Sequence, residues 1–130
     1  MSWEEISSRG AAAPPDALLV GCKKSGQNCW QISLDFGPQL AQQLGVEIDK
    51  RVQIYRGYDG DLGLVKLRTR DTKLGHKIRK HPSRRGHSLI SFSASRWGVK
   101  KSFREQVCSA DLDPKGDVIV KLPRWARVSS

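Results

Sequence analysis

The sequence predicts a mainly β protein (β-rich α+β), folded as a small barrel of two pseudo-repeats, each a strand, a short helix and a hairpin. Three observations support this fold class: short stretches of alternating apolar residues, Gly/Asp turns between them, and the same order of elements occurring twice. The 130 residues, 38% of them hydrophobic, suffice for one core. We expect a flexible N-terminal arm at residues 1–16 and a single β-rich domain at 17–130.

The first repeat covers about residues 29–68. Apolar and polar residues alternate over residues 30–34, which is typical of a strand with one polar face. Residues 38–45 predict a helix of about two turns, because a proline stands at its first position and a glycine follows its last leucine. Residues 52–67 hold two strand patterns around a Gly/Asp-rich turn, which predicts a β-hairpin.

The second repeat covers about residues 88–122 and follows the same order. Residues 89–92 predict a strand, and the apolar residues around Trp97 predict a short turn or helix. Residues 107–122 predict a hairpin around an Asp/Pro/Gly turn, with the weaker strand pattern first.

The two repeats align residue by residue at three places. Ile32-Ser33-Leu34 matches Ile90-Ser91-Phe92, Val52 matches Val107, and residues 64–67 match residues 119–122. Neither unit alone has enough apolar residues to bury its own face, so we expect both to share one core. Coincidence between two ordinary hairpins is the alternative.

Positive charge is concentrated in the middle of the chain. The net charge of the protein is +10, yet residues 65–104 hold thirteen Lys/Arg and a single acid, Asp71. The rest of the chain is nearly neutral. Such asymmetry indicates a polyanionic partner. The alternative is a charge run that only keeps the protein soluble.

Residues 71–87, DTKLGHKIRKHPSRRGH, contain two glycines, a proline and few residues to bury, which predicts a mobile basic arm. Flexible cationic segments neutralise phosphates, and an Arg-Arg-Gly sequence in this arm suits a minor groove. Trp97 is a candidate for stacking on a base, although a place in the core is the favoured prediction for it. The predicted nucleic-acid-binding residues are Lys73, Lys77, Arg79, Lys80, Arg84, Arg85, Arg96, Lys100, Lys101 and Arg104.

The first repeat resembles the AbrB-type swapped-hairpin domain of bacterial transition-state regulators and antitoxins. The resemblance lies in WQISLDFGPQLAQQLGVEIDKRVQIYRGYDGDLGLVKL, with Leu44-Gly45-Val46 at the helix end. It implies two hairpins interlocked in one barrel that binds DNA through basic residues, here with both halves fused by residues 71–87. Asp35-Phe36-Gly37 is an insertion relative to that pattern. Gln42 and Gln43 stand where DNA-binding members often carry basic residues, which assigns more of the DNA contact to the second repeat.

The sequence contains few features typical of a metal-binding protein, an enzyme or a membrane protein. The spacing of Cys22, Cys29 and Cys108 does not match common zinc sites, and we expect no metal and no cofactor. No phosphate-binding loop or catalytic constellation stands out, so we expect no enzyme. The chain shows no secretory signal and no membrane-spanning stretch, which predicts a cytoplasmic protein.

We therefore predict a nucleic-acid-binding accessory or regulatory protein, for example in transcription regulation, with double-stranded DNA as the favoured ligand. The alternative is a protein-interaction module or inhibitor that docks on an acidic protein surface. The sequence leaves open whether the ligand is DNA or RNA, whether binding is sequence-specific, and whether the protein is a monomer or a homodimer.

Overall fold

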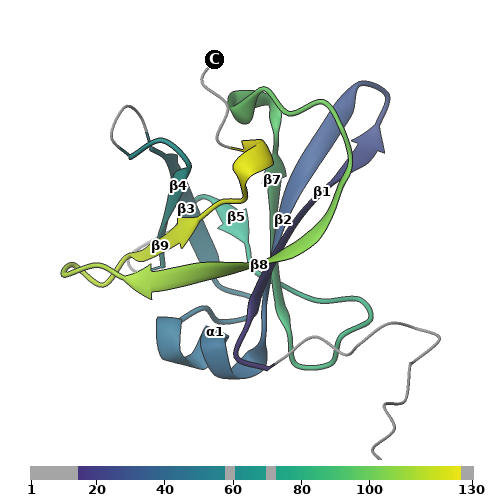
Figure 1. The fold of residues 1–130 in the computed structure, drawn as a ribbon. Coiled ribbons are helices and arrows are strands. Elements are labelled where there is room, and N and C mark those ends of the chain that lie inside the picture. The colour runs from purple at the N-terminus through teal and green to yellow at the C-terminus, as the bar shows by residue number, and fades with distance from the viewer. Residues whose placement is uncertain (1–14, 58–60, 70–72, 127–130) are drawn as a thin grey trace, which may run out of the picture.

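The computed structural model describes residues 15–57, 61–69 and 73–126. One antiparallel sheet of nine strands, in the order β5-β3-β4-β9-β8-β1-β2-β7-β6, curls into a nearly closed barrel (Figure 1). This confirms the predicted mainly β fold and small barrel. The strands are β1 (Leu18–Gly26), β2 (Cys29–Phe36), β3 (Arg51–Arg56), β4 (Leu64–Arg68), β5 (His76–Lys77), β6 (Arg79–Lys80), β7 (Ser88–Ser93), β8 (Phe103–Leu112) and β9 (Val118–Lys121).

The helix α1 (Pro38–Leu44) lies where the sequence predicts it and covers one end of the barrel. Proline occupies its first turn, where a missing N–H costs nothing. Gly45 ends it with a left-handed φ of 75° and donates its N–H to the Ala41 carbonyl. The second repeat has a shorter counterpart, the 3₁₀ helix η2 (Ser95–Trp97). A further 3₁₀ turn, η3 (Arg124–Ala126), follows β9.

Strand β1 has no counterpart in the sequence-based prediction, which began the first repeat at residue 29. Its side chains alternate, and Leu18, Val20 and Cys22 are buried. It pairs with β2 on one side and with β8 on the other. Residues 1–14 of the expected N-terminal arm lie outside the described residues. The carbonyl of Pro15 accepts a hydrogen bond from the Gln39 N–H of α1.

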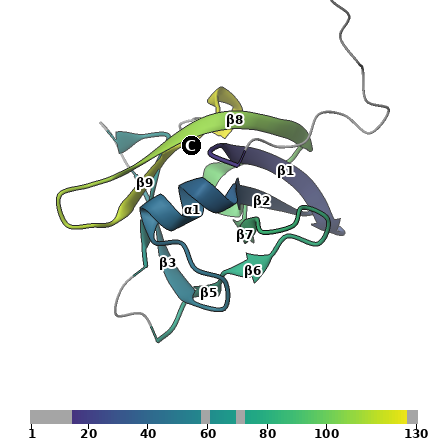
Figure 2. The ribbon, with the colours of Figure 1, turned by 90° about the horizontal axis from the view of Figure 1, so that it is seen from below.

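Residues 76–80 close the barrel, in contrast to the mobile arm expected at 71–87. β5 pairs with β3, β6 pairs with β7, and Ile78 between them is fully buried. Ile78 donates its N–H to the Lys50 carbonyl and accepts a hydrogen bond from the Asp49 N–H, both at 2.8 Å. Figure 2 shows β5 and β6 following each other between β3 and β7. The expectation was wrong here because Ile78 is the one apolar residue of the segment 76–80, which leaves no visible periodicity.

Equivalent strands of the two repeats pair with each other. In β2 and β7 the aligned residues Ser33 and Ser91 are direct antiparallel partners, and in β4 and β9 the aligned Val65 and Val120 are partners. When two equivalent strands pair antiparallel, a local two-fold axis passes between the two equivalent residues that lie directly opposite each other. A pseudo-two-fold axis therefore passes through both pairs, on opposite walls of the barrel.

The symmetry also relates β1 to the closing segment. Val20 of β1 pairs with Gln106 in β8. His76 of β5 pairs with Val52 in β3. In the two repeats, Val20 corresponds to His76 and Gln106 corresponds to Val52. Each unit thus begins with a strand that joins its own second strand to the hairpin of the other unit. The buried residues of both units accordingly belong to one shared core.

One part of the predicted alignment is off by one residue. In the β3–β4 ladder Ile54 lies opposite Leu67, which aligns with residue 122. In the β8–β9 ladder Ala110 lies opposite Val120, so Cys108 comes opposite residue 122. Ile54 therefore corresponds to Cys108. Val52 is fully buried, whereas Val107 is 70% exposed. The match of these two valines was therefore wrong, because it compared an inward with an outward side chain.

Candidate nucleic-acid interface

A groove of about 560 Å³ runs over the outer face of β1, β2 and β7. We call it the basic groove. Its floor comes from the strands, and its sides come from β6 with the following loop and from the first part of β8. The residues that line it are Gly21, Cys22, Lys23, Gln31, Ser33, Arg79, Lys80, His81, Pro82, Ser83, Arg84, Leu89, Ser91, Phe103 and Glu105.

Strand alternation produces the polar floor. Ile32 and Leu34 of β2 point into the core, so Gln31 and Ser33 point outward. Ser91 of β7 faces Ser33 directly across the ladder. The pseudo-two-fold axis therefore passes through the middle of the basic groove.

Three cations flank this floor. Lys23, Arg79 and Lys80 are exposed, and none of them forms an ion pair with an acid in the described ranges. Lys23 pairs with Gln31 and Arg79 pairs with Leu89, in equivalent positions of the two units. Lys23 was missed in the sequence because no strand was assigned around it.

Asp35 anchors the loop 81–87 at one end of the groove. It points outward from β2, yet it is only 1% exposed because this loop covers it. Its Oδ1 lies 2.9 Å from Nδ1 of His87. Its Oδ2 forms an ion pair with Arg84 and lies 3.7 Å from Nε2 of His81. A buried carboxylate with such partners fixes the position of the segment that supplies them.

Arg84 extends this network to β8. Its Nη2 and Nη1 donate to the two carboxylate oxygens of Glu105 at 2.9 and 3.0 Å. The hydrogen bonds with Glu105, more than those with Asp35, raise the pKa of Arg84. Glu105 reaches Arg84 across Gly21, where an added Cβ would lie 3.0 Å from the Glu105 Cγ. The glycine thus leaves room for a bridge between the two sides of the groove.

His81 is held in its neutral form by the same loop. Its Nδ1 accepts hydrogen bonds from the backbone N–H groups of Ser83 and Arg84, at 3.1 and 3.0 Å. A protonated Nδ1 accepts no hydrogen bond. Burial lowers the pKa of His81, and the nearby Asp35 carboxylate opposes this shift only in part.

The ten basic residues predicted from the sequence occupy different situations. Arg79, Lys80 and Arg84 line the basic groove, but Arg84 is engaged by two carboxylates. Lys77 forms an ion pair with Asp49 at 3.6 Å, outside the groove. The others are exposed and form no ion pair with an acid in the described part of the chain: Lys73, Arg85, Arg96, Lys100, Lys101 and Arg104.

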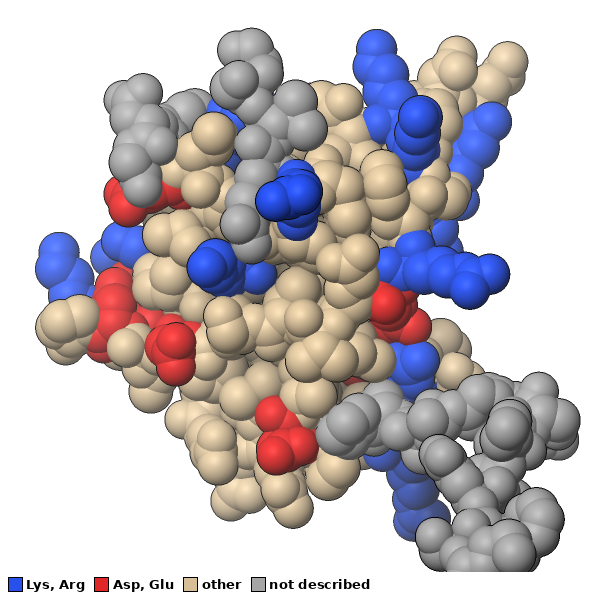
Figure 3. All heavy atoms as spheres, viewed as in Figure 1, with Lys and Arg blue, Asp and Glu red and all other residues tan. Residues whose placement is uncertain are grey.

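Basic side chains are densest on one side of the face drawn in Figure 3. Figure 3 shows them at the upper right, over the β1–β2 hairpin and the segment before β8, whereas most acidic side chains of this face lie to the left and below. The pairing of Cys22 with Phe103 places Arg104 beside the strand that carries Lys23. The groove therefore opens next to further cations that form no ion pair within the described ranges.

Trp97 is not available for base stacking. Its side chain is 6% exposed, and its ring packs against Phe92 with 5.0 Å between the centroids. The suggested stacking role was therefore wrong, and the core position is the one observed. The aromatic residue that lines the groove is Phe103, which is stacked on Trp125 with 4.7 Å between the centroids.

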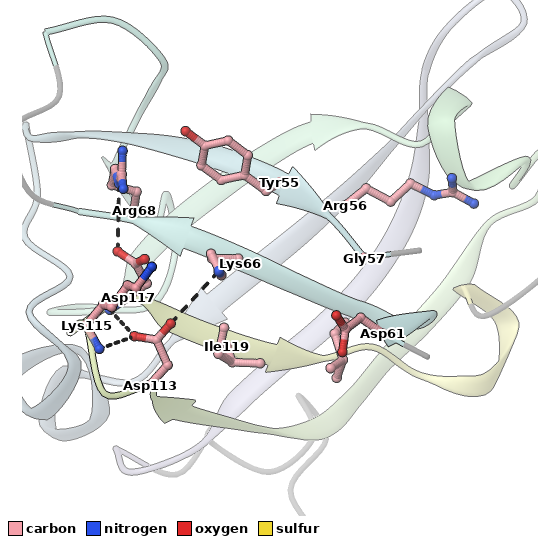
Figure 4. A pocket seen from close by; sticks show the side chains of 11 residues that line it. Tyr55, Arg56, Gly57, Asp61, Lys66, Arg68, Asp113, Lys115, Asp117 and Ile119 are labelled. Carbon is pink, nitrogen blue, oxygen red and sulfur yellow. Dashed lines mark hydrogen bonds and ion pairs between the residues drawn. The ribbon is translucent and has the colours of Figure 1, made fainter. Parts of the chain in front are cut away.

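A second pocket, of about 690 Å³, lies on the opposite wall, over β3, β4 and β9 (Figure 4). Tyr55 is 45% exposed there, beside basic side chains. Acids offset these cations: Lys66 lies 4.0 Å from Asp113, and Arg68 lies 4.0 Å from Asp117. Four basic and three acidic residues line this pocket, so it offers a polyanion far less than the basic groove.

The described residues also limit other kinds of site. They contain no group of three or more His, Cys, Asp or Glu side chains arranged to hold a metal ion. The three cysteines are free thiols, and burial raises the pKa of Cys22. No helix within the described ranges has the length and apolar character needed to cross a membrane.

Comparison with known proteins gives no relative: no family model, no curated protein and no solved structure matches this chain.

Proposed function

We propose that this protein binds nucleic acid, as an accessory or regulatory protein, through phosphate contacts in the basic groove. The observation that carries the proposal is the set Lys23, Arg79 and Lys80, exposed around one groove and free of carboxylate partners among the described residues. Lysine and arginine that neutralise phosphates release condensed counterions, which is the main source of affinity for nucleic acid.

The fixed loop makes the groove a better phosphate site than a mobile arm. Asp35 holds the segment that follows Arg79 and Lys80, so these side chains are presented without a large loss of backbone entropy on binding. The six exposed cations outside the groove supply further, less localised contacts.

The paired repeats support the proposal that the chain is a fused form of the AbrB-type swapped-hairpin barrel. In such a chain one polypeptide would supply both halves of a symmetric binding surface. The preference for duplex DNA and a role in transcription stay predictions from the sequence.

The proposal is tested by removing the groove cations together. The variant K23A/R79A/K80A should bind any nucleic-acid ligand of the wild type roughly 100-fold more weakly at about 0.1 M salt, because three phosphate contacts are lost. Fluorescence anisotropy with labelled DNA and RNA measures this. The matched control, K50A/K115A/K121A, removes the same charge at exposed positions outside the groove and should bind within a few-fold of wild type.

Equal weakening in both triple variants would refute a localised groove. Absence of binding to DNA and RNA at low salt would refute the function itself. In that case, a protein retained from nuclease-treated lysate and lost with K23A/R79A/K80A would favour the alternative of docking on an acidic protein surface.

A further inference from the structure

The dimensions of the basic groove bear on which form of nucleic acid enters it. Its floor is three strands, β1, β2 and β7, and Arg79 of β6 lies beyond them. At a spacing of about 4.8 Å between strands, β1 and β6 are about 14 Å apart. The side chains of Lys23 and Arg79 narrow the space further. A B-form duplex is wider, since its major and minor grooves are together about 16 Å deep.

One end of the groove is also bridged. Arg84 contacts Asp35 of β2 and Glu105 of β8 at the same time, so this ion-paired bridge lies across the outer face of the sheet. A rigid duplex cannot settle between the two sides against the bridge. A single strand can bend around it, because its backbone torsions are not fixed by pairing.

One of the residues that line the groove is aromatic. Phe103 lines it, and its side chain is partly buried: it packs against the core, and its ring is stacked nearly parallel, at 3°, on Trp125. Unpaired bases stack on such rings, whereas the bases of an intact duplex are already stacked on one another. Polar floor groups, the hydroxyls of Ser33 and Ser91 and the amide of Gln31, lie in the same groove and suit base edges or sugars.

We propose that the basic groove binds a single strand of nucleic acid, with its phosphates on Lys23, Arg79 and Lys80 and an unpaired base stacked on Phe103. This inference rests on the proposed function and names its ligand class. A single strand thus replaces double-stranded DNA, the ligand favoured by the sequence. The charge pattern of the sequence gives the number of cations but not the width of the groove between them.

The test compares one labelled oligodeoxythymidylate alone and annealed to its complement, at one salt concentration. Wild type should bind the single strand more tightly. Replacing Phe103 by leucine keeps an apolar side chain and removes the ring. F103L should lower the single-strand affinity roughly 5- to 100-fold and leave any residual duplex affinity within about twofold.

Two further variants keep the test decisive. F103Y retains the ring and should bind the single strand with wild-type affinity. A purely structural defect in F103L would not weaken the binding of the single strand alone. Y55L removes an exposed aromatic from the opposite wall and should bind as wild type does. Tighter binding of the duplex, or single-strand affinity unchanged in F103L, would overturn the single-strand inference while leaving nucleic-acid binding intact. Absence of binding to both ligands would instead overturn the proposed function.

Discussion

Asp35 is the residue on which the form of the groove depends. An outward-facing aspartate in a strand is normally solvated, but here a histidine, an arginine and a second histidine surround it and exclude water. Ion pairs in such a setting contribute little net stability, since desolvation offsets their attraction. Their effect is positional: they hold the loop 81–87 over the buried carboxylate.

Acid should loosen this loop through His81. Because burial lowers its pKa in the folded protein, unfolded chains take up a proton near pH 6.5 that folded chains refuse. The stabilisation is fully present above about pH 6.5 and is lost as the pH falls below it. Urea denaturation from pH 7.5 to 5.5 should therefore show a falling free energy of unfolding.

The variant H81Q isolates this contribution. A glutamine oxygen can accept the two backbone N–H groups and does not titrate, so the pH dependence should become shallower than that of wild type. H76Q, at an exposed histidine in β5, serves as the matched control and should keep the wild-type dependence. The same slope in H81Q and wild type, or a wild type that gains stability on acidification, would contradict this role.

At the scale of elements, the closing segment 76–80 shows what sequence patterns reveal and what they conceal. The helix α1 and both hairpins were predictable because each carries its own signal: a proline and glycine at the ends, or alternation around a turn. The closing segment has one buried residue, Ile78, and its strand character comes entirely from neighbours that lie far away in the sequence.

Ile78 should therefore contribute far more to stability than its polar surroundings indicate. The variant I78A should lower the free energy of unfolding by about 2–5 kcal/mol, as truncation of a fully buried side chain does. Urea denaturation measures the change. V107A, at a residue that is 70% exposed, should change stability by no more than about 0.5 kcal/mol. A cost for I78A as small as that of V107A would mean that the segment does not close the barrel.

The candidate site was only partly predictable, again for physical reasons. Arg79 and Lys80 were identified from charge alone. The engagement of Arg84 was not, because its partners Asp35 and Glu105 belong to strands that come together only in the folded barrel. Lys23 was hidden in an unassigned strand. Charge density thus marks the region of the chain, and the strand pairing determines which cations remain available.

At the scale of the whole molecule, two interlocked units form one barrel around a pseudo-two-fold axis. The axis emerges between Ser33 and Ser91 in the basic groove and between Val65 and Val120 on the opposite wall. The two ends differ in charge: cations without an ion pair among the described residues flank the first, and ion-paired side chains line the second. The symmetric framework therefore carries an asymmetric distribution of charge.

The central claim, that phosphates bind in the basic groove, is tested most directly by the salt dependence of the affinity. For about six phosphate contacts, log K against log salt should fall with a slope of about −4 on a single strand or −5 on a duplex. K23A/R79A/K80A should reduce the magnitude of the slope by about 2 to 3. A wild-type affinity indifferent to salt, or a slope unchanged in this variant, would contradict the account.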